Sequence, residues 1–319
     1  MLQLILKRAI SLPFVILSIT FITFIVGYLA PGDPILTMMG PRHDPEMYAQ
    51  LKHAYGLDLP WYVQYANYVT GLLHGSFGLS FRFEGRTVLD LLGSGVSVSF
   101  TLGLAALTLS LLLGVPIGIF AALRQNSALD RGSMGIMLVM YSIPSFVLIP
   151  IFQWINYQLY AHALPSLPVA GWGTPQHWIL PVIVLMAANL GYIGRLTRST
   201  MLEVLRQDYI RTAYAKGLKN RRVNWVHAFR NAMLPIVTHV GPSIAFLVTG
   251  AFVVENLFAI PGIGFVSIQA IARRDYPVMQ GTAVILVVVV LIMFTTVPCG
   301  LSLAGGIGCK VMSRSWAVP

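Results

Sequence analysis

Residues 195–235 are the most informative stretch for predicting the fold: RLTRSTMLEVLRQDYIRTAYAKGLKNRRVNWVHAFRNAMLP. The stretch holds nine of the chain's 21 Lys and Arg residues and only two acids. Apolar residues recur at roughly helical spacing between Met201 and Tyr209. Gly217 then permits a sharp turn because it lacks a Cβ atom, and a second helical stretch covers residues 221–232. The pattern predicts two short helices that meet at a glycine and form a compact basic knob.

The regions on both sides of this stretch are uncharged and apolar. Residues 179–194 and 234–254 contain no Asp, Glu, Lys or Arg. Over all 319 residues, 56% are hydrophobic and 10% are charged, whereas soluble domains carry about 25% charged residues. This composition excludes an ordinary soluble enzyme and a disordered chain. Because the apolar runs are long and do not alternate, we expect an all-α integral membrane protein.

Six segments are long and apolar enough to be transmembrane helices. The first follows a basic start, and its length favours a retained span over a cleaved signal peptide. The predicted spans are residues 9–29, 98–122, 134–157, 179–194, 234–254 and 281–303.

Basic residues sort to one side of the predicted membrane. Six spans place both termini on the same side, and 15 of the 21 Lys and Arg residues fall there. This positive-inside pattern predicts cytoplasmic termini and accounts for the net charge of +10 without nucleic acid.

The predicted spans also divide the chain. We expect an N-terminal tail and first span over 1–30, an extracytoplasmic segment over 31–97, a five-span core over 98–303 with a cytoplasmic coupling loop at 195–233, and a C-terminal tail over 304–319.

The residues of the basic stretch resemble a known motif. RTAYAKGL at 211–218, followed by HAFRNAMLP at 227–235, resembles the "EAA" loop of binding-protein-dependent ABC importer permeases, most of all the dipeptide, oligopeptide and nickel branch. The generic Glu-Ala-Ala is here Arg-Thr-Ala, while the glycine and the Leu-Pro are retained. The resemblance implies that the ATPase-coupling residues are Arg211, Thr212, Ala213, Tyr214, Ala215, Lys216, Gly217, Leu218, Leu234 and Pro235.

Further motifs of the same branch occur in order along the chain. They cover about residues 1–293, and it is their joint order that is specific. They are PGDP at 31–34, YGLDLP at 55–60, GSFGLS at 75–80, ENLF at 255–258, PGIG at 261–264 and RDYPVMQG at 274–281.

The resemblance implies a fold and a set of partners. It implies the type I ABC importer permease fold in the cytoplasmic (inner) membrane of a bacterium or archaeon. The expected partners are the lipid bilayer, a second homologous permease, two cytoplasmic ABC ATPases and an extracytoplasmic solute-binding protein. In this family the loop helix docks into a groove on an ATPase, and closure of the two ATPases around ATP switches the permease between inward- and outward-facing states.

No catalytic machinery is recognisable in the sequence. There is no G-x-x-x-x-G-K-[ST] phosphate loop, so ATP and Mg²⁺ are expected on the separate ATPase subunits and no cofactor on this chain. The seven histidines and two cysteines lack metal-ligand spacing, so we expect neither a metal site nor catalytic residues.

The resemblance leaves the cargo less defined than the machinery. Short peptides are expected. The alternatives are nickel complexes or oligosaccharides imported by the same machinery, or a stand-alone ion-coupled carrier. An ion-coupled carrier would be expected to place ionisable residues within its spans, and almost none occur there.

Three residues are candidates for a gate or a translocation pathway. His239 lies within the fifth predicted span, where a structural hydrogen bond is the alternative role. Glu255 ends the same span and forms an outer gate, a contact with the binding protein, or a structural hydrogen bond. Pro144 interrupts the third predicted span, as a hinge or as a fixed kink.

The last residues depart from the family's pattern. The branch usually has an Asn, then an Asp, and a Tyr…Asp-Pro-Arg ending, whereas residues 294–319 read FTTVPCGLSLAGGIGCKVMSRSWAVP. A frameshift near codon 293 or a cloning artefact accounts for the abrupt change, and a divergent natural tail is the alternative.

Overall fold

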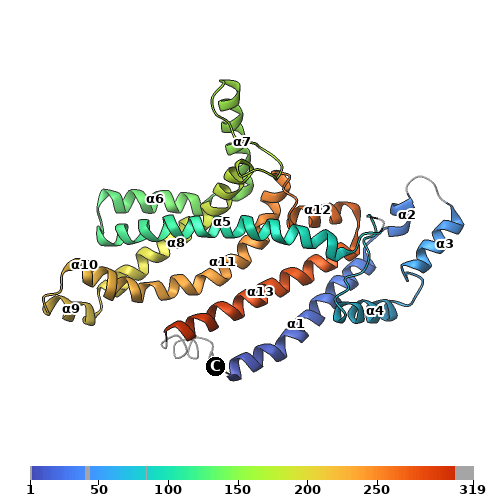
Figure 1. Cartoon of the computed structure of the whole chain (residues 1–319), viewed down its shortest axis with the longest axis horizontal. Helices are drawn as coiled ribbons and strands as arrows, with labels where there is room; N and C mark the ends of the chain where they lie inside the picture. Colours follow the sequence, from blue (N-terminus) through green and yellow to red (C-terminus); the bar gives the residue numbers. More distant parts are fainter. Residues whose placement is uncertain (1, 40–43, 84, 306–319) are drawn as a thin grey trace. The chain divides into compact units, whose positions relative to one another are not determined.

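The computed structural model describes residues 2–39, 44–83 and 85–305, with side chains omitted at 1–11, 37, 246, 248–250 and 294–305. Within these ranges the chain is helical, and its β structure is a single isolated bridge between Leu79 and Thr87 (Figure 1). The predicted all-α class is confirmed. The atypical residues 294–319 lie outside the side chains that the structure describes.

The first of two compact units combines the start of the chain with a later segment. It comprises residues up to Ser99 together with Ile260–Ile292. Its helices are α1 (Leu2–Leu29), α2 (Pro34–Met39), α3 (Pro45–Ala54), α4 (Trp61–Leu73), the first part of α5 (Val88–Leu123), α12 (Ile263–Arg273) and most of α13 (Tyr276–Gly305).

The second unit is centred on residues Phe100–Ala259. It contains the rest of α5, then α6 (Ala128–Ser142), α7 (Ser145–Ala161), α8 (Gln176–Leu205), α9 (Asp208–Ala215), α10 (Asn220–Arg222), the π-helix η1 (Val223–Phe229) and α11 (Arg230–Leu257).

A buried carboxylate joins two distant segments of the chain inside the first unit. Ser80 Oγ donates a hydrogen bond of 2.5 Å to Asp275, and the backbone N–H of Phe81 donates to the same carboxylate at 3.1 Å. Ser80 and Asp275 are both buried. The GSFGLS and RDYPVMQG motifs, almost 200 residues apart in sequence, therefore meet at one hydrogen-bonded site.

Helix α8 is the most enclosed of the long helices in the second unit. It packs against α6, α7 and α11. Glycines permit the closest approaches: a Cβ on Gly118 of α5 would lie 2.5 Å from the Gly194 carbonyl oxygen and 2.6 Å from Thr197 Cβ. On the α6 side, a Cβ on Gly191 would lie 3.0 Å from Tyr141 Cβ. Small residues at such crossings let helix backbones pack tightly where lipid offers no hydrophobic driving force.

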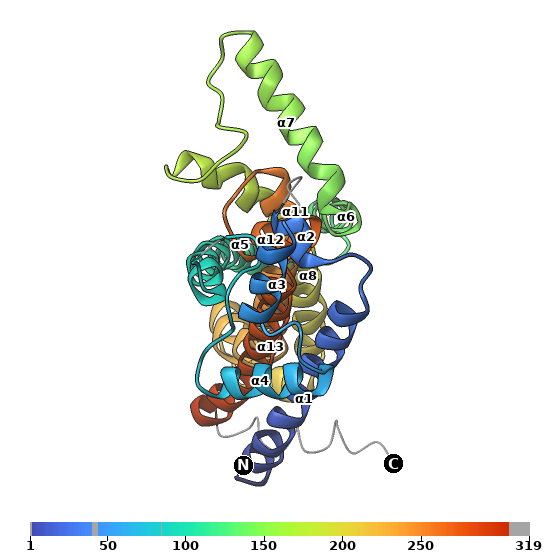
Figure 2. The same cartoon turned by 90° about the vertical axis from the view of Figure 1, so that its right-hand side faces the viewer.

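The third predicted span is not one straight helix. α6 ends at Ser142, α7 begins at Ser145, and the two axes differ by 104°. Figure 2 shows α6 nearly end-on while α7 runs across the view. Pro144 causes the break because its ring disfavours helical geometry at Ile143, which is extended (φ −83°, ψ 120°). The expectation of a continuous helix over 134–157 is therefore corrected to a broken pair.

Length and apolarity identify four candidate membrane-spanning helices among the described residues. They belong to α1, α5, α8 and α13, and the α6–α7 pair makes a fifth if it is counted as one span. The remaining predicted span, 234–254, lies inside α11. The number of spans and the side of each terminus stay predictions.

We predict that Gly118→Ala destabilises the second unit. Its new methyl group would overlap the α8 backbone, and overpacking of this kind costs about 1–3 kcal/mol. Gly132→Ala is the matched control, since a Cβ there meets nothing within 4 Å. Thermal unfolding of the purified protein in detergent should show a lower midpoint for Gly118→Ala alone. Equal midpoints for the two variants would contradict the close-packed crossing.

Candidate functional site

The predicted two-helix knob is present at one end of α8 and α11. We define the knob as α9, α10, η1 and the first turn of α11, which lie together beyond the end of α8 (Figure 1). The first predicted stretch is divided, because Met201–Leu205 continue α8 and two residues then link α8 to α9. Only the part from Asp208 to the turn at Gly217 forms the short helix that the sequence predicted. The second stretch differs from the prediction, because a π-helical segment leads without a break into α11 and Pro235 lies inside that helix.

Gly217 terminates α9 by a specific backbone geometry. Its φ of +76° is left-handed, a conformation that favours glycine. Leu218 N–H donates to the Ala213 carbonyl at 3.4 Å, and Gly217 N–H donates to the Tyr214 carbonyl at 2.9 Å. These two bonds form a Schellman motif, which satisfies the last carbonyls of the helix. A Cβ on Gly217 would meet nothing within 4 Å, so the backbone conformation and not space requires glycine.

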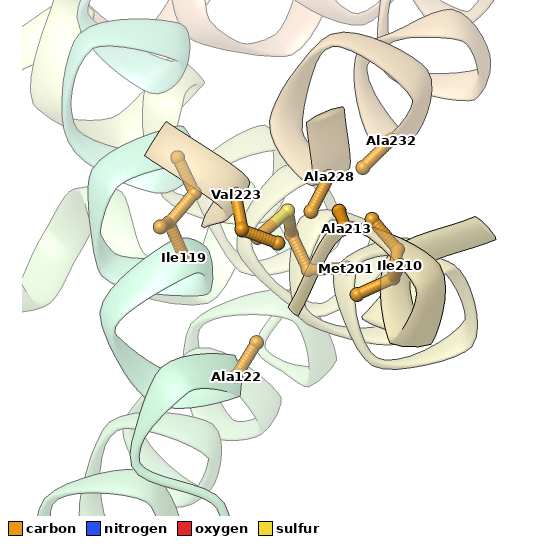
Figure 3. Close-up of a cluster of buried hydrophobic side chains, with 8 residues drawn as sticks. All are labelled: Ile119, Ala122, Met201, Ile210, Ala213, Val223, Ala228 and Ala232. Atoms are coloured by element: carbon orange, nitrogen blue, oxygen red, sulfur yellow. The ribbon is translucent and has the colours of Figure 1, made fainter. Parts of the chain in front are cut away.

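A dedicated apolar cluster holds the knob against the long helices. Figure 3 shows the Met201 side chain from α8 among residues of α9 and η1. Residues of α5 and α11 complete this cluster, which we call the knob core. Its buried members are Ile119, Ala122, Met201, Ile210, Ala213, Val223, Ala228 and Ala232.

The predicted coupling residues separate into two groups in the structure. Ala213 is buried in the knob core, and its coupling role stays a prediction. Leu218 and Leu234 are half-buried. The exposed coupling residues are Arg211, Thr212, Tyr214, Ala215, Lys216, Gly217 and Pro235.

The knob also exposes apolar side chains that sequence reasoning missed. Trp225 is 46% exposed and Val226 is 51% exposed, both on η1, and Tyr209 is 44% exposed on α9. Trp225 is steadied by an edge-on contact with Phe229, with ring centroids 5.4 Å apart. The signal available in the sequence was Trp-Val between the Arg pair and His227, in a loop otherwise rich in charge. Exposed aromatic residues beside basic ones are typical of protein interfaces.

Side-chain hydrogen bonds hold α9 against the second half of the knob. Tyr214 OH donates to Asn224 Oδ1 at 3.2 Å, and Asn231 Nδ2 donates to Tyr209 OH at 3.1 Å. Together with the knob core they fix the two helices as one body.

A buried ion pair secures α8 two turns before the knob. Arg198 Nε and Nη2 donate to the two oxygens of Asp130 at 2.5 and 2.7 Å. Asn126 N–H donates to the same carboxylate at 2.9 Å, and Asp130 is almost fully buried at the start of α6. This bidentate geometry fixes α8 to the α5–α6 turn.

Two of the three gate candidates line one cavity. It has a volume of about 650 Å³ and lies at the α6–α7 break, between α8 and α11. Pro144 borders the break, and His239 stacks on Tyr192 with ring centroids 4.1 Å apart. The cavity is lined by Tyr141, Ser142, Ile143, Pro144, Ser145, Val184, Leu185, Ala188, Asn189, Tyr192, His239, Pro242, Ser243 and Leu247.

Glu255 lies apart from the other two candidates. It is fully buried in the last turn of α11 and does not line this cavity. The neighbouring backbone is tied to the α7–α8 connection, where Gly171 N–H donates to the Phe258 carbonyl at 2.8 Å. Within the part of the chain that the structure describes, no group of three His, Cys, Asp or Glu residues is placed to hold a metal ion.

We predict that Arg198→Met destabilises the protein by about 3 kcal/mol, because it leaves the buried Asp130 carboxylate without its partner. The double variant Asp130→Leu with Arg198→Met should recover most of that loss. Arg211→Met is the control, since its pair with Asp208 is exposed and 3.8 Å long. Thermal unfolding in detergent checks the ranking, and a double variant as unstable as the single one would contradict it.

Two family models match the chain. The model for the binding-protein-dependent transport system inner membrane component matches residues 114–299, and the model for the N-terminal part of such membrane components matches residues 1–86.

Curated proteins match over most of their lengths. Dipeptide transport system permease protein DppB of Bacillus subtilis (strain 168) is 39% identical over 287 residues, which cover 90% of this chain and 91% of the relative. Oligopeptide transport system permease protein OppB of Salmonella typhimurium (strain LT2) is 38% identical over 289 residues, which cover 89% and 92%.

Among solved structures, the inward-facing MetNI methionine ABC transporter matches with a TM-score of 0.54. It is 18% identical and covers 70% of this chain and 96% of its own. At that identity the likeness supports the fold alone, which is the type I permease fold. The family predicted from the EAA-like motif is confirmed, and this chain belongs to the inner membrane components of binding-protein-dependent ABC transport systems.

Proposed function

We propose that this chain is one permease subunit of an ATP-driven importer of short peptides. In this proposal it pairs with a second homologous permease, two cytoplasmic ABC ATPases and an extracytoplasmic solute-binding protein. The chain provides part of the pathway, and ATP is bound and hydrolysed with Mg²⁺ on the ATPase subunits.

The knob is the observation that carries the proposal. It has its own apolar core, two hydrogen bonds between its halves and a tightly terminated first helix. Its outer surface combines exposed aromatic residues with Arg211 and Lys216. A rigid body with an apolar and basic surface is suited to docking in a groove with acidic rims. Because α8 and α11 lead directly into it, movement of a docked partner is passed to the long helices.

The relatives support peptide cargo. Their names describe dipeptide and oligopeptide transport, and the matches extend over about nine tenths of this chain. The family membership does not favour a stand-alone ion-coupled carrier.

The proposal is tested first by composition and then by transport. The tagged chain should co-purify from gently solubilised native membranes with a second permease and two P-loop ATPases. The complex, reconstituted in proteoliposomes with its binding protein, should accumulate radiolabelled Ala-Ala only when ATP is present. Purification of the chain alone and folded would contradict the assembly, and ATP-independent accumulation would contradict the energy source.

We predict that Gly217→Val uncouples the importer. A β-branched residue at φ +76° is strained by about 1–2 kcal/mol or more, so the end of α9 should reorganise. Gly217→Asn is the matched control, because Asn tolerates the left-handed conformation. We expect Gly217→Val to lower ATP-driven Ala-Ala uptake at least tenfold and Gly217→Asn to stay within about threefold of wild type. Uptake by Gly217→Val at the wild-type rate would contradict the coupling role.

We also predict that Trp225→Ala weakens the association of the ATPase subunits at least tenfold. A half-exposed tryptophan on a docking surface is a typical energetic hot spot. Trp61→Ala is the control, since Trp61 is similarly exposed on α4 in the other unit. Titration of the purified ATPase onto the permease complex in nanodiscs measures both affinities. Equal affinities for the two variants would remove η1 from the docking surface.

A further inference from the structure

The cavity beside the α6–α7 break is lined by a buried amide that is only partly hydrogen-bonded among the described residues. Asn189 lines this cavity and is 7% exposed, and its Nδ2 makes no hydrogen bond within the described part of the chain. A buried donor without an acceptor is costly, and the cost is higher within a membrane protein than at a wet surface. The presence of an unpartnered buried donor in a folded protein therefore needs a physical explanation.

The other end of the amide is held in place. Ser243 Oγ on α11 donates to Asn189 Oδ1 at 3.3 Å, and both side chains are buried. In this arrangement Oδ1 is the engaged end of the amide, and Nδ2 is the end without a partner among the described residues.

The surrounding lining is mostly apolar and includes three aromatic side chains. One turn along α8, Tyr192 stacks on His239 of α11, and Tyr141 lies 6.2 Å from Tyr192 between ring centroids. Among the described residues that line this cavity there is no Asp, Glu, Lys or Arg. A ligand group that suits this site is therefore a neutral acceptor with a flat face. The cavity volume falls in the range that small ligands occupy.

We propose that Asn189 Nδ2 donates a hydrogen bond to the peptide-bond carbonyl of cargo in transit, with the peptide plane against the Tyr192–His239 pair. This inference rests on the proposed import of peptides. The carbonyl is the neutral acceptor that all dipeptides share, so one donor serves cargo with different side chains. The charged ends of the peptide find no counter-charge in the lining of this cavity.

The structural alternative predicts the opposite behaviour of one variant. If Asn189 has no ligand, Asn189→Leu removes an unsatisfied buried donor and leaves function unchanged, with equal or higher stability. If Asn189 contacts cargo, the same variant loses transport while its stability is kept. Ser133→Ala is the matched control, because Ser133 lies on α6 outside the cavity lining and bonds the Asp130 carbonyl of its own helix at 3.1 Å.

The test uses the complete importer in proteoliposomes with saturating, Ala-Ala-loaded binding protein. We expect Asn189→Leu to lower the uptake rate about tenfold, the scale of one lost hydrogen bond, while ATP hydrolysis and the thermal midpoint stay near wild type. Ser133→Ala should stay within about twofold. Asn189→Ala is measured in parallel, in case the leucine variant does not assemble.

A second substrate identifies the atom that is recognised. The thioamide analogue of Ala-Ala replaces the carbonyl oxygen with sulfur, a larger atom and a weaker acceptor, and keeps the planarity and the charge. Wild type should import it more slowly than Ala-Ala, and the Asn189 variants should import both at similar rates. The contribution of the binding protein is common to all permease forms and cancels in this cycle.

The outcomes separate the two proposals. Failure of wild type to import Ala-Ala would contradict the proposed cargo and this site with it. Import by wild type with an unchanged rate in both Asn189 variants would overturn the site alone. An equal preference for Ala-Ala over its thioamide in wild type and in the Asn189 variants would also overturn it.

Discussion

The burial of Met201 in the knob core is the interaction on which the attachment of the knob to the long helices depends. That side chain comes from the C-terminal part of α8 and packs against α9 and η1, with α5 and α11 completing the cluster. A short helix is marginal on its own, so α9 is stable only because tertiary packing supplies its apolar partners. The same contact makes the knob rigid with respect to two long helices. Without it the exposed tyrosine and tryptophan surface would lie on a loop, and a partner bound there would move the loop and not the helices.

The interior of the second unit follows a related constraint. Lipid provides no hydrophobic driving force for helix association, so van der Waals contacts between closely packed helices have to stabilise the unit. Gly118 and Gly191 bring α5 and α6 onto α8 within backbone contact distance. Arg198 and Asp130 show a buried charge that is fully paired, through a bidentate bond. Asn189 Nδ2 and Trp178 Nε1 are buried without a partner among the described residues of this unit, and of these two Asn189 is the one that lines the cavity beside the α6–α7 break.

The sequence predicted the features that local pattern controls. Long apolar runs predicted the helical class, and Gly217 predicted the turn that ends α9, because only its backbone freedom matters there. Pairings between distant residues could not be predicted from local pattern: Asp130 and Arg198 are 68 positions apart, and Ser80 and Asp275 are 195 apart. Pro144 was visible as an interruption, but a bend of 104° depends on what packs around it. Ala213 was assigned to the docking face because small residues suit both a core and an interface, and only packing separates the two.

The continuity of α8 has a mechanical meaning. Sixteen residues separate Asn189 from Leu205, and at 1.5 Å per residue they span about 24 Å of unbroken helix. Asn189 in the cavity wall and Leu205 beside the knob therefore lie at the two ends of one continuous helical segment. A tilt of about 10° about the cavity end displaces the knob end by about 4 Å, which is about three quarters of the helical pitch. Small angular changes among the packed helices therefore correspond to displacements large enough for a docked subunit to impose or to sense.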